Sequence, residues 1–199
     1  ILACHKIISR SPGDDLLHGD GGNDRLFGAT GADRLFGGHG DDLLAGGDGS
    51  DELEGGGGGD SMRGGNGDDV LVGGDGDDLI RGDRGGDRLE GGQGADVYVF
   101  QFEDDLPLES QSRTEIIDSS GKGNQMAFIG GMQAEDVILI RNSGEADIEI
   151  QYGYAEMPMK SSVFVLDGAN GEVITQFRFS DGQTMSFEQL CQANSDTCE

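Results

Sequence analysis

Two successive stretches of nine residues decide the fold of this chain: residues 37–45 read GGHGDDLLA, and residues 46–54 read GGDGSDELE. Both follow the pattern Gly-Gly-x-Gly-x-Asp-x-(apolar)-x, and the pattern continues in both directions without a slip. Its aspartates stand nine residues apart at Asp15, Asp24, Asp33, Asp42, Asp51, Asp60, Asp69, Asp78, Asp87 and Asp96. A glycine lies two residues before each of them, and a large apolar or aromatic residue lies two residues after. The chain therefore contains ten nonapeptide units, over residues 10–99.

The period predicts a stacked coil. Glycine alone reaches left-handed backbone conformations without steric cost, so the first six residues of a unit are predicted to form a tight turn. The last three are predicted to form a short strand whose central side chain points inward. One unit cannot bury a single apolar side chain alone, so the units must stack. With two strands and two turns per winding, ten units predict an all-β fold, a parallel β-roll (β-solenoid) of five windings.

In such a coil each unit lies against the next unit but one, so the aspartates form two columns. One contains Asp15, Asp33, Asp51, Asp69 and Asp87, and the other contains Asp24, Asp42, Asp60, Asp78 and Asp96. Carboxylates stacked at strand spacing repel each other unless a cation lies between them. Carboxylate and carbonyl oxygens favour Ca²⁺ over Zn²⁺ or copper, and Mg²⁺ prefers to keep its waters. All ten aspartates are predicted metal ligands, and four gaps in each column allow up to about eight Ca²⁺ ions.

The gaps are predicted to be unequal, because four units lack glycine at the second turn position. The residues there are Ser11, Asp20, Ala29 and Asp83. The firmest gaps are expected in the middle and C-terminal half: Asp42/Asp60, Asp51/Asp69, Asp60/Asp78 and Asp78/Asp96. The gap between Asp15 and Asp33 is expected to be the weakest.

The repeat over residues 10–99 closely resembles the RTX nonapeptide repeat of haemolysin-type calcium-binding proteins. The resemblance implies a parallel β-roll in which the aspartate side chain and turn carbonyls bind Ca²⁺ between successive windings. It assigns that role to the ten aspartates named above.

The second half of the chain has an ordinary composition and predicts further strands. These lie at 115–117, 126–129, 137–140, 146–152, 163–166 and 173–179. Asp181-Gly182 predicts a turn, and Ser186 with Gln189 three residues later predicts a capping box for a short last helix. A solenoid needs an end cap over its final apolar layer. The expected division is an N-terminal lead-in (1–9), the calcium-binding roll (10–99) and a β-rich capping, secretion-associated domain (100–199).

Three short stretches of this half resemble the domain that commonly follows RTX arrays. They are residues 135–141, 146–150 and 179–182. The resemblance implies a region that nucleates folding of the array and lies close to a type I secretion signal.

Composition excludes several other functions. The 199 residues carry a formal charge of −26, which opposes binding to nucleic acid or anionic lipid. No run of 18 apolar residues is present, so no transmembrane segment is predicted. The histidines form no His-Glu-x-x-His motif, and no nucleophile elbow or phosphate-binding loop occurs, so no catalytic residue is predicted.

The ends of the chain are less informative. The first residues have no initiator methionine, so a piece of a longer protein is expected. Of the three cysteines, Cys191 and Cys198 could form a disulfide or remain separate thiols, and Cys4 makes the count odd.

The leading functional hypothesis is a calcium-triggered folding module of a larger bacterial protein that is secreted by the type I route. Its expected partners are calcium ions, the secretion machinery and the upstream domains of the parent. The module itself is not expected to be an enzyme. One alternative is an accessory substrate-binding module of a secreted lipase, protease or polysaccharide epimerase. Another is a part of an adhesin or a cytolytic toxin.

Overall fold

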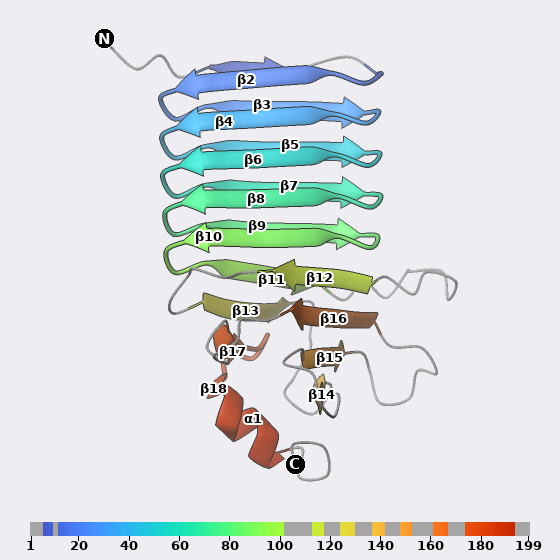
Figure 1. Cartoon of the computed structure of the whole chain (residues 1–199), viewed down its shortest axis with the longest axis vertical. Helices are drawn as coiled ribbons and strands as arrows, with labels where there is room; N and C mark the ends of the chain where they lie inside the picture. Colours follow the sequence, from blue (N-terminus) through green and yellow to red (C-terminus); the bar gives the residue numbers. More distant parts are fainter. Residues whose placement is uncertain are drawn as a thin grey trace.

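The computed structural model describes residues 6–9, 12–101, 113–117, 124–129, 137–141, 148–152, 161–166 and 174–193. It contains eighteen strands and one helix within those ranges (Figure 1). The strands of the repeat region are β1 Ile7–Ser9, β2 Leu16–Gly21, β3 Arg25–Thr30, β4 Arg34–His39, β5 Leu43–Asp48, β6 Glu52–Gly57, β7 Ser61–Asn66, β8 Val70–Asp75, β9 Leu79–Arg84, β10 Arg88–Gln93 and β11 Val97–Gln101. The later elements are β12 Arg113–Ile117, β13 Asn124–Ile129, β14 Val137–Arg141, β15 Ile148–Tyr152, β16 Ser161–Leu166, β17 Ile174–Arg178, β18 Thr184–Ser186 and α1 Phe187–Ala193.

Alternate strands belong to opposite sheets, as the two-sided coil requires. One sheet has the order β1-β3-β5-β7-β9-β11-β13-β17-β18, and the other has β14-β15-β16-β12-β10-β8-β6-β4-β2. The pairs within the roll are parallel, and their register joins equivalent positions of every second unit, such as Leu35 with Leu53 and Leu44 with Met62. The predicted all-β parallel β-roll with about five windings is confirmed (Figure 1).

The predicted length of the strands is wrong. Each complete unit contributes six strand residues instead of three, because sheet pairing continues into the first three turn residues. The first turn glycine is buried inside the strand, and the second pairs with its equivalent one winding away, as Gly38 does with Gly56. Only the remaining three residues of each unit reverse the chain.

The core consists of the inward side chains of both sheets, and it continues beyond the repeats. It comprises Leu17, Leu26, Leu35, Leu44, Leu53, Met62, Leu71, Ile80, Leu89 and Tyr98, followed by Phe100, Ile116, Met126, Phe128, Ile174, Phe177, Phe179 and Leu190. Ile116 pairs with Leu89 and Met126 pairs with Tyr98, so the described part of the second half extends both sheets. The predicted capping box is also confirmed, because Gln189 N donates to Ser186 Oγ at 3.2 Å and Ser186 N donates to Gln189 Oε1 at 2.8 Å.

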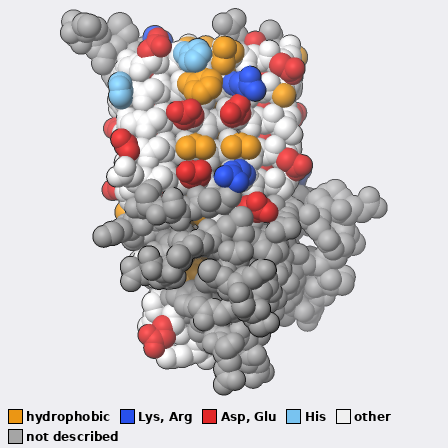
Figure 2. All heavy atoms as spheres, in the orientation of Figure 1, with side chains coloured by type: hydrophobic (Ala, Val, Ile, Leu, Met, Phe, Trp, Pro, Cys, Tyr) orange, Lys and Arg blue, Asp and Glu red, His pale blue; other side chains and the backbone are white. Residues whose placement is uncertain are grey.

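The outward positions of the roll carry mixed side chains. Figure 2 shows apolar, acidic and basic groups side by side on the face that β2, β4, β6, β8 and β10 present. On this face His18 stacks on Phe36, with ring centroids 4.9 Å apart. Within the described residues no helix is long and apolar enough to span a membrane.

Candidate metal centre

The repeat aspartates lie at the start of each strand, where the chain leaves a turn. Nine of the ten are buried, with at most 3% of their surface exposed: Asp24, Asp33, Asp42, Asp51, Asp60, Asp69, Asp78, Asp87 and Asp96. Asp15, at the end of its column, is half-buried. The structure therefore brings the predicted residues together in two buried columns, one along each edge of the roll.

One oxygen of each carboxylate is held by the neighbouring winding. The backbone N–H of Asp42 donates to Asp60 Oδ1 at 2.7 Å, and Asp60 N–H donates in turn to Asp78 Oδ1 at 2.7 Å. The other column repeats the arrangement, for example from Asp51 N–H to Asp69 Oδ1 at 2.8 Å. These bonds fix the orientation of the side chains and connect each winding to the next.

The second oxygen of these carboxylates is buried and receives no hydrogen bond in eight aspartates. They are Asp24, Asp33, Asp42, Asp51, Asp60, Asp69, Asp78 and Asp87. A buried ionised oxygen without a partner is costly, because it has lost its hydration without compensation. One such atom would be a local defect, but eight at one repeat position indicate a ligand that the protein oxygens are arranged to receive.

The first glycine of each unit leaves the space that such a ligand needs. A Cβ atom on Gly37 would lie 2.5 Å from Asp42 Oδ2 and 2.6 Å from the carbonyl oxygen of Gly55, one winding away. A carboxylate oxygen and a carbonyl oxygen from consecutive windings therefore face the same point. The same pair of oxygens surrounds Gly64, namely Asp69 Oδ2 and the Gly82 carbonyl.

This donor set fits a hard divalent cation. It contains carboxylate and carbonyl oxygens, which suit the flexible oxygen coordination of Ca²⁺. No cluster of three or more His, Cys, Asp or Glu side chains occurs among the described residues, so the side-chain cage typical of zinc is not found in that part of the chain. Gaps such as those beside Gly37 and Gly64 instead combine side-chain and backbone oxygens from two windings. The ten aspartates as ligands remain a prediction, which this geometry supports.

The electrostatics of the columns favour a bound cation. Burial raises the pKa of six of the carboxyls: Asp42, Asp51, Asp60, Asp69, Asp78 and Asp87. The pKa reaches about 6 for Asp60 and Asp87 and about 7 for Asp69 and Asp78. The backbone hydrogen bond opposes the rise, and neighbouring carboxylates add to it. Without a metal, burial in the folded columns therefore disfavours the ionised form of these carboxyl groups.

This shift predicts opposite pH dependences for the metal-free and metal-loaded protein. The metal-free fold binds more protons than the unfolded chain, whose aspartates keep a pKa near 3.8. Its free energy of unfolding should be greatest below about pH 4 and should fall as the pH rises through about 6 to 7. With a cation bound the carboxylates are ionised, so stability should be lost as the pH falls. The change of the β signal in circular dichroism between pH 5 and pH 7.5, recorded with chelated and with calcium-saturated protein, gives both slopes. Slopes of the same sign would contradict this account.

Two residues outside the repeat complete the columns, and sequence reasoning missed both. Asn124, fully buried at the start of β13, accepts a hydrogen bond from Asp96 N–H through Oδ1 at 2.9 Å, as an aspartate of the next winding would. The side chain of Thr114 in β12 interacts with the Asp87 carboxyl and opposes the rise of its pKa. No repeat motif surrounds either residue. The one available signal was the apolar residue two positions later, Ile116 and Met126.

The acidic neighbours of the column residues have a different role. Asp41 Oδ1 accepts from Gly59 N–H at 3.1 Å, Asp68 Oδ1 from Gly86 N–H at 2.8 Å, and Asp77 Oδ1 from Ala95 N–H at 2.9 Å. Each therefore ties its turn to the equivalent turn of the next winding. Of the histidines, His18 and His39 lie on the outer surface of the strands, and His5 lies outside the described residues. Cys4 and Cys198 also lie outside them, and the side chain of Cys191 is not described.

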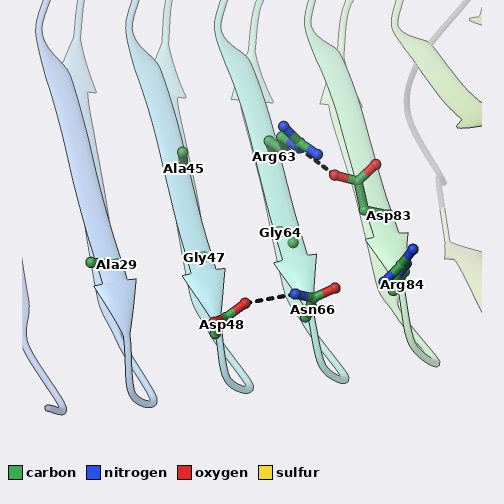
Figure 3. Close-up of a pocket in the computed structure, with 10 residues that line it drawn as sticks. Ala29, Ala45, Gly47, Asp48, Arg63, Gly64, Asn66, Asp83 and Arg84 are labelled. Carbon is green, nitrogen blue, oxygen red and sulfur yellow. Dashed lines mark hydrogen bonds and ion pairs between the residues drawn. The ribbon is translucent and has the colours of Figure 1, made fainter. Parts of the chain in front are cut away.

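A separate groove of about 480 Å³ lies over the outer face of the odd-numbered strands (Figure 3). Its lining comprises Ala29, Ala45, Gly47, Asp48, Arg63, Gly64, Gly65, Asn66, Asp83 and Arg84. Asp83 forms ion pairs with Arg63 and with the adjacent Arg81, and Asn66 Nδ2 donates to Asp48 Oδ1 at 2.6 Å. Asp83 has a φ of 72° at a turn position where most units carry glycine. The groove lies on a strand face, and its lining includes none of the ten repeat aspartates.

Comparison with known proteins gives a family match to the repeat region. The sequence profile of the RTX calcium-binding nonapeptide repeat (four copies) matches residues 11–35, 27–62 and 63–98. Among solved structures, the chain is similar to the AlgE6R3 subunit from the Azotobacter vinelandii mannuronan C5-epimerase, with 17% identity, coverage of 81% of this chain and 70% of that chain, and a TM-score of 0.24. It is also similar to the extracellular lipase LipA from Serratia marcescens, with 17% identity, coverage of 87% and 39%, and a TM-score of 0.32. No curated protein matches the sequence significantly.

Proposed function

Because residues 11–98 are RTX calcium-binding nonapeptide repeats, we propose that this chain is a calcium-triggered folding module whose two aspartate columns bind the ions. The observation that carries the proposal is the row of buried Oδ2 atoms that receive no hydrogen bond. Six of them (in Asp24, Asp33, Asp42, Asp60, Asp69 and Asp78) face a backbone carbonyl of the next winding across a space kept open by glycine. Calcium bound there would neutralise the carboxylates and connect consecutive windings, so it would act as a structural ion between turns.

Folding and calcium binding are expected to be one event. The core of the repeats contains only ten side chains, five from each sheet, which is little apolar surface for about 90 ordered residues. The chain also carries a formal charge of −26, which opposes compaction. A ligand that binds only the folded chain stabilises it by mass action, with about 1.4 kcal/mol per site at ten times the dissociation constant.

This coupling supports a role outside the cell. Calcium sites of extracellular modules have dissociation constants of about 10⁻⁴ to 10⁻³ M, and such sites fill only where calcium is abundant. We propose that the chain belongs to a secreted bacterial protein, crosses the type I secretion machinery unfolded, and folds when it meets millimolar calcium. The parent's upstream domains and the export channel are then its partners, and the described residues have a structural role in place of a catalytic one.

Replacing one column aspartate tests the assignment of the ligands. Asp60→Asn keeps the oxygen that accepts the Asp42 N–H but removes the charge from two adjacent gaps. We expect the loss of one or two bound calcium ions and about 1.4 kcal/mol of calcium-dependent stability per lost site. Isothermal titration calorimetry and thermal melts measure these effects. Asp75→Asn, an exposed aspartate on β8, is the matched control and should leave both unchanged. Equal stoichiometry in both variants would exclude Asp60 as a ligand.

A second candidate function is recognition of an anionic ligand, such as an acidic polysaccharide, in the groove of Figure 3. The observation that favours it is the local charge. Arg63, Arg81 and Arg84 gather around Asp48 and Asp83, which leaves a net positive cluster on a strongly acidic protein. The module would then assist substrate binding by a secreted lipase, protease or polysaccharide epimerase, or surface binding by an adhesin or toxin.

A glycan array probed with calcium-loaded protein tests this second function. Binding to acidic glycans is expected to fall at least tenfold in Arg63→Ser and Arg84→Ser. Arg88→Ser, on the opposite sheet, should bind as the parent does. Binding that depends equally on all three arginines would indicate a nonspecific charge effect, and absence of binding would remove the function.

A further inference from the structure

The N-terminal residues continue the repeat in phase. Lys6 stands two repeat units before Asp24, and Ile8 stands two repeat units before Leu26, so they occupy the aspartate and apolar positions of an additional unit. Strand β1 pairs with β3 in the repeat register, with Ile8 opposite Leu26. The roll therefore has a further half-winding at its N-terminal end, in which a cation replaces the carboxylate.

The backbone of Lys6 makes the bonds of a column aspartate. Lys6 N–H donates to Asp24 Oδ1 at 2.5 Å, as Asp24 N–H donates to Asp42 Oδ1 at 2.7 Å. The Lys6 carbonyl accepts from Arg25 N–H at 2.9 Å, as the Asp24 carbonyl accepts from Leu43 N–H at 2.9 Å. Lys6 differs from a column residue in its side chain alone.

That side chain extends into the gap between the first two windings of its column. Lys6 Nζ donates to the carbonyl oxygen of Gly19 at 2.6 Å and to the Asp20 carboxylate at 2.7 Å. Gly19 is the first glycine of its unit. In the next gap of the column, the carbonyl of the equivalent Gly37 faces Asp24 Oδ2. The space between them is the one that a Cβ atom on Gly19 would fill, and that atom would lie 2.7 Å from Asp24 Oδ2. The ammonium thus contacts the carbonyl that, in the other gaps, faces the proposed ion.

We propose that the Lys6 ammonium is a built-in cation that takes the place of calcium in the terminal gap of the Asp24 column. This inference rests on the proposed function, because it assumes that calcium fills the equivalent gaps. A terminal gap has a neighbouring winding on one side only, so an ion there would be more exposed to water. A tethered charge is always present at high local concentration and needs no calcium to arrive.

Asp20 fits the same arrangement. It has a φ of 73° at the second turn position, a backbone conformation that is unfavourable for residues other than glycine. Its carboxylate pairs with Lys6 at 2.7 Å, so the ammonium has a carbonyl and a carboxylate as its ligands. Asp20, in its strained conformation, therefore forms an ion pair with a cation of the same chain, the Lys6 ammonium. The Asp15 column has no lysine at its start among the described residues, and its first aspartate is only half-buried.

Reversing the charge of Lys6 tests the proposal. Lys6→Asp places an aspartate at the column position and should create a calcium site, so native mass spectrometry and calorimetry in millimolar calcium should find one ion more than in the parent. Arg25→Asp makes the same change of charge on the outer face of β3 and should keep the parental number. An unchanged count in Lys6→Asp, or an equal gain in Arg25→Asp, would overturn the proposal. A parent that binds no calcium would instead refute the proposed function.

A neutral variant decides the case if Lys6→Asp does not fold. Lys6→Met keeps the backbone bonds and most of the length of the side chain but removes the charge. In the calcium-loaded protein, amide hydrogen exchange of Arg25, which donates to the Lys6 carbonyl, should accelerate at least tenfold. Exchange at Leu43, one winding away, should remain as in the parent. Unchanged exchange at Arg25 would show that the ammonium does not hold the terminal winding, and would overturn the proposal.

Discussion

Removal of calcium is expected to unfold the roll almost completely. In excess EGTA at pH 7.5 the far-ultraviolet β signal should be lost over the repeat region, and it should return cooperatively when millimolar calcium is added. The reason is that eight buried carboxylate oxygens receive no hydrogen bond, and burial opposes the ionisation of six of these carboxyl groups. Circular dichroism and analytical ultracentrifugation measure the change, because the unfolded chain is also much more expanded.

Magnesium provides the control for this experiment. At the same concentration it should restore little structure, because Mg²⁺ keeps its waters and demands a strict octahedron. The same β content in EGTA as in calcium would refute calcium-triggered folding. Recovery with either ion, or with salt alone, would show that general screening of the −26 charge is the cause.

The second large effect is expected from adding a single methyl group at Gly37. In Gly37→Ala the new Cβ would lie 2.5 Å from Asp42 Oδ2 and 2.6 Å from the Gly55 carbonyl, closer than such atoms can approach. Either the Asp42 carboxylate or the neighbouring winding must move, and both border the space proposed for the ion. We expect the loss of one bound calcium and a destabilisation of about 3 kcal/mol, measured by calorimetry and calcium-saturated melts.

Gly57→Ala is the matched control for this prediction. Gly57 lies in the next strand of the same sheet, and a Cβ there would meet only His39 Nδ1, at an ordinary 3.5 Å. Its φ is not in the left-handed region, so alanine is tolerated without strain. This variant should bind calcium as the parent does. Equal effects at both positions would mean that glycine matters for backbone freedom alone and not for the space beside the carboxylate.

The sequence was sufficient to predict the roll because its period is strict. Register follows directly from identical spacing, so the pairing of Leu35 with Leu53 and the burial of the row of leucines needed no further information. The two aspartate columns follow from the same spacing. The length of the strands did not, because the pattern suggested that glycine ends a strand. In the structure Gly38 and Gly56 pair within the sheet while their φ values are 110° and 111°.

The ends of the columns were beyond prediction for a different reason. Thr114 and Asn124 reach the aspartate position from segments with no repeat motif, so their places depend on how those segments pair with β10 and β11. Lys6 lies within the predicted lead-in of residues 1–9. Lys6 and Ile8 have the phase of the repeat, but the charge of Lys6 is opposite to that of the consensus aspartate.

The alternation of strands between two sheets restricts how the length of this protein can change. Each terminal residue is matched to one column: Lys6 and Asn124 bracket the Asp24 column, and Thr114 follows Asp87 in the other. Deleting one nonapeptide would transfer every later strand to the opposite sheet, so the C-terminal part of the chain would lie on the other side of the roll relative to the N-terminus. Deleting two would remove one full winding and preserve the relative orientation of the two ends. Insertions and deletions that keep this orientation therefore come in pairs of nonapeptides, although the motif itself recurs with every single one.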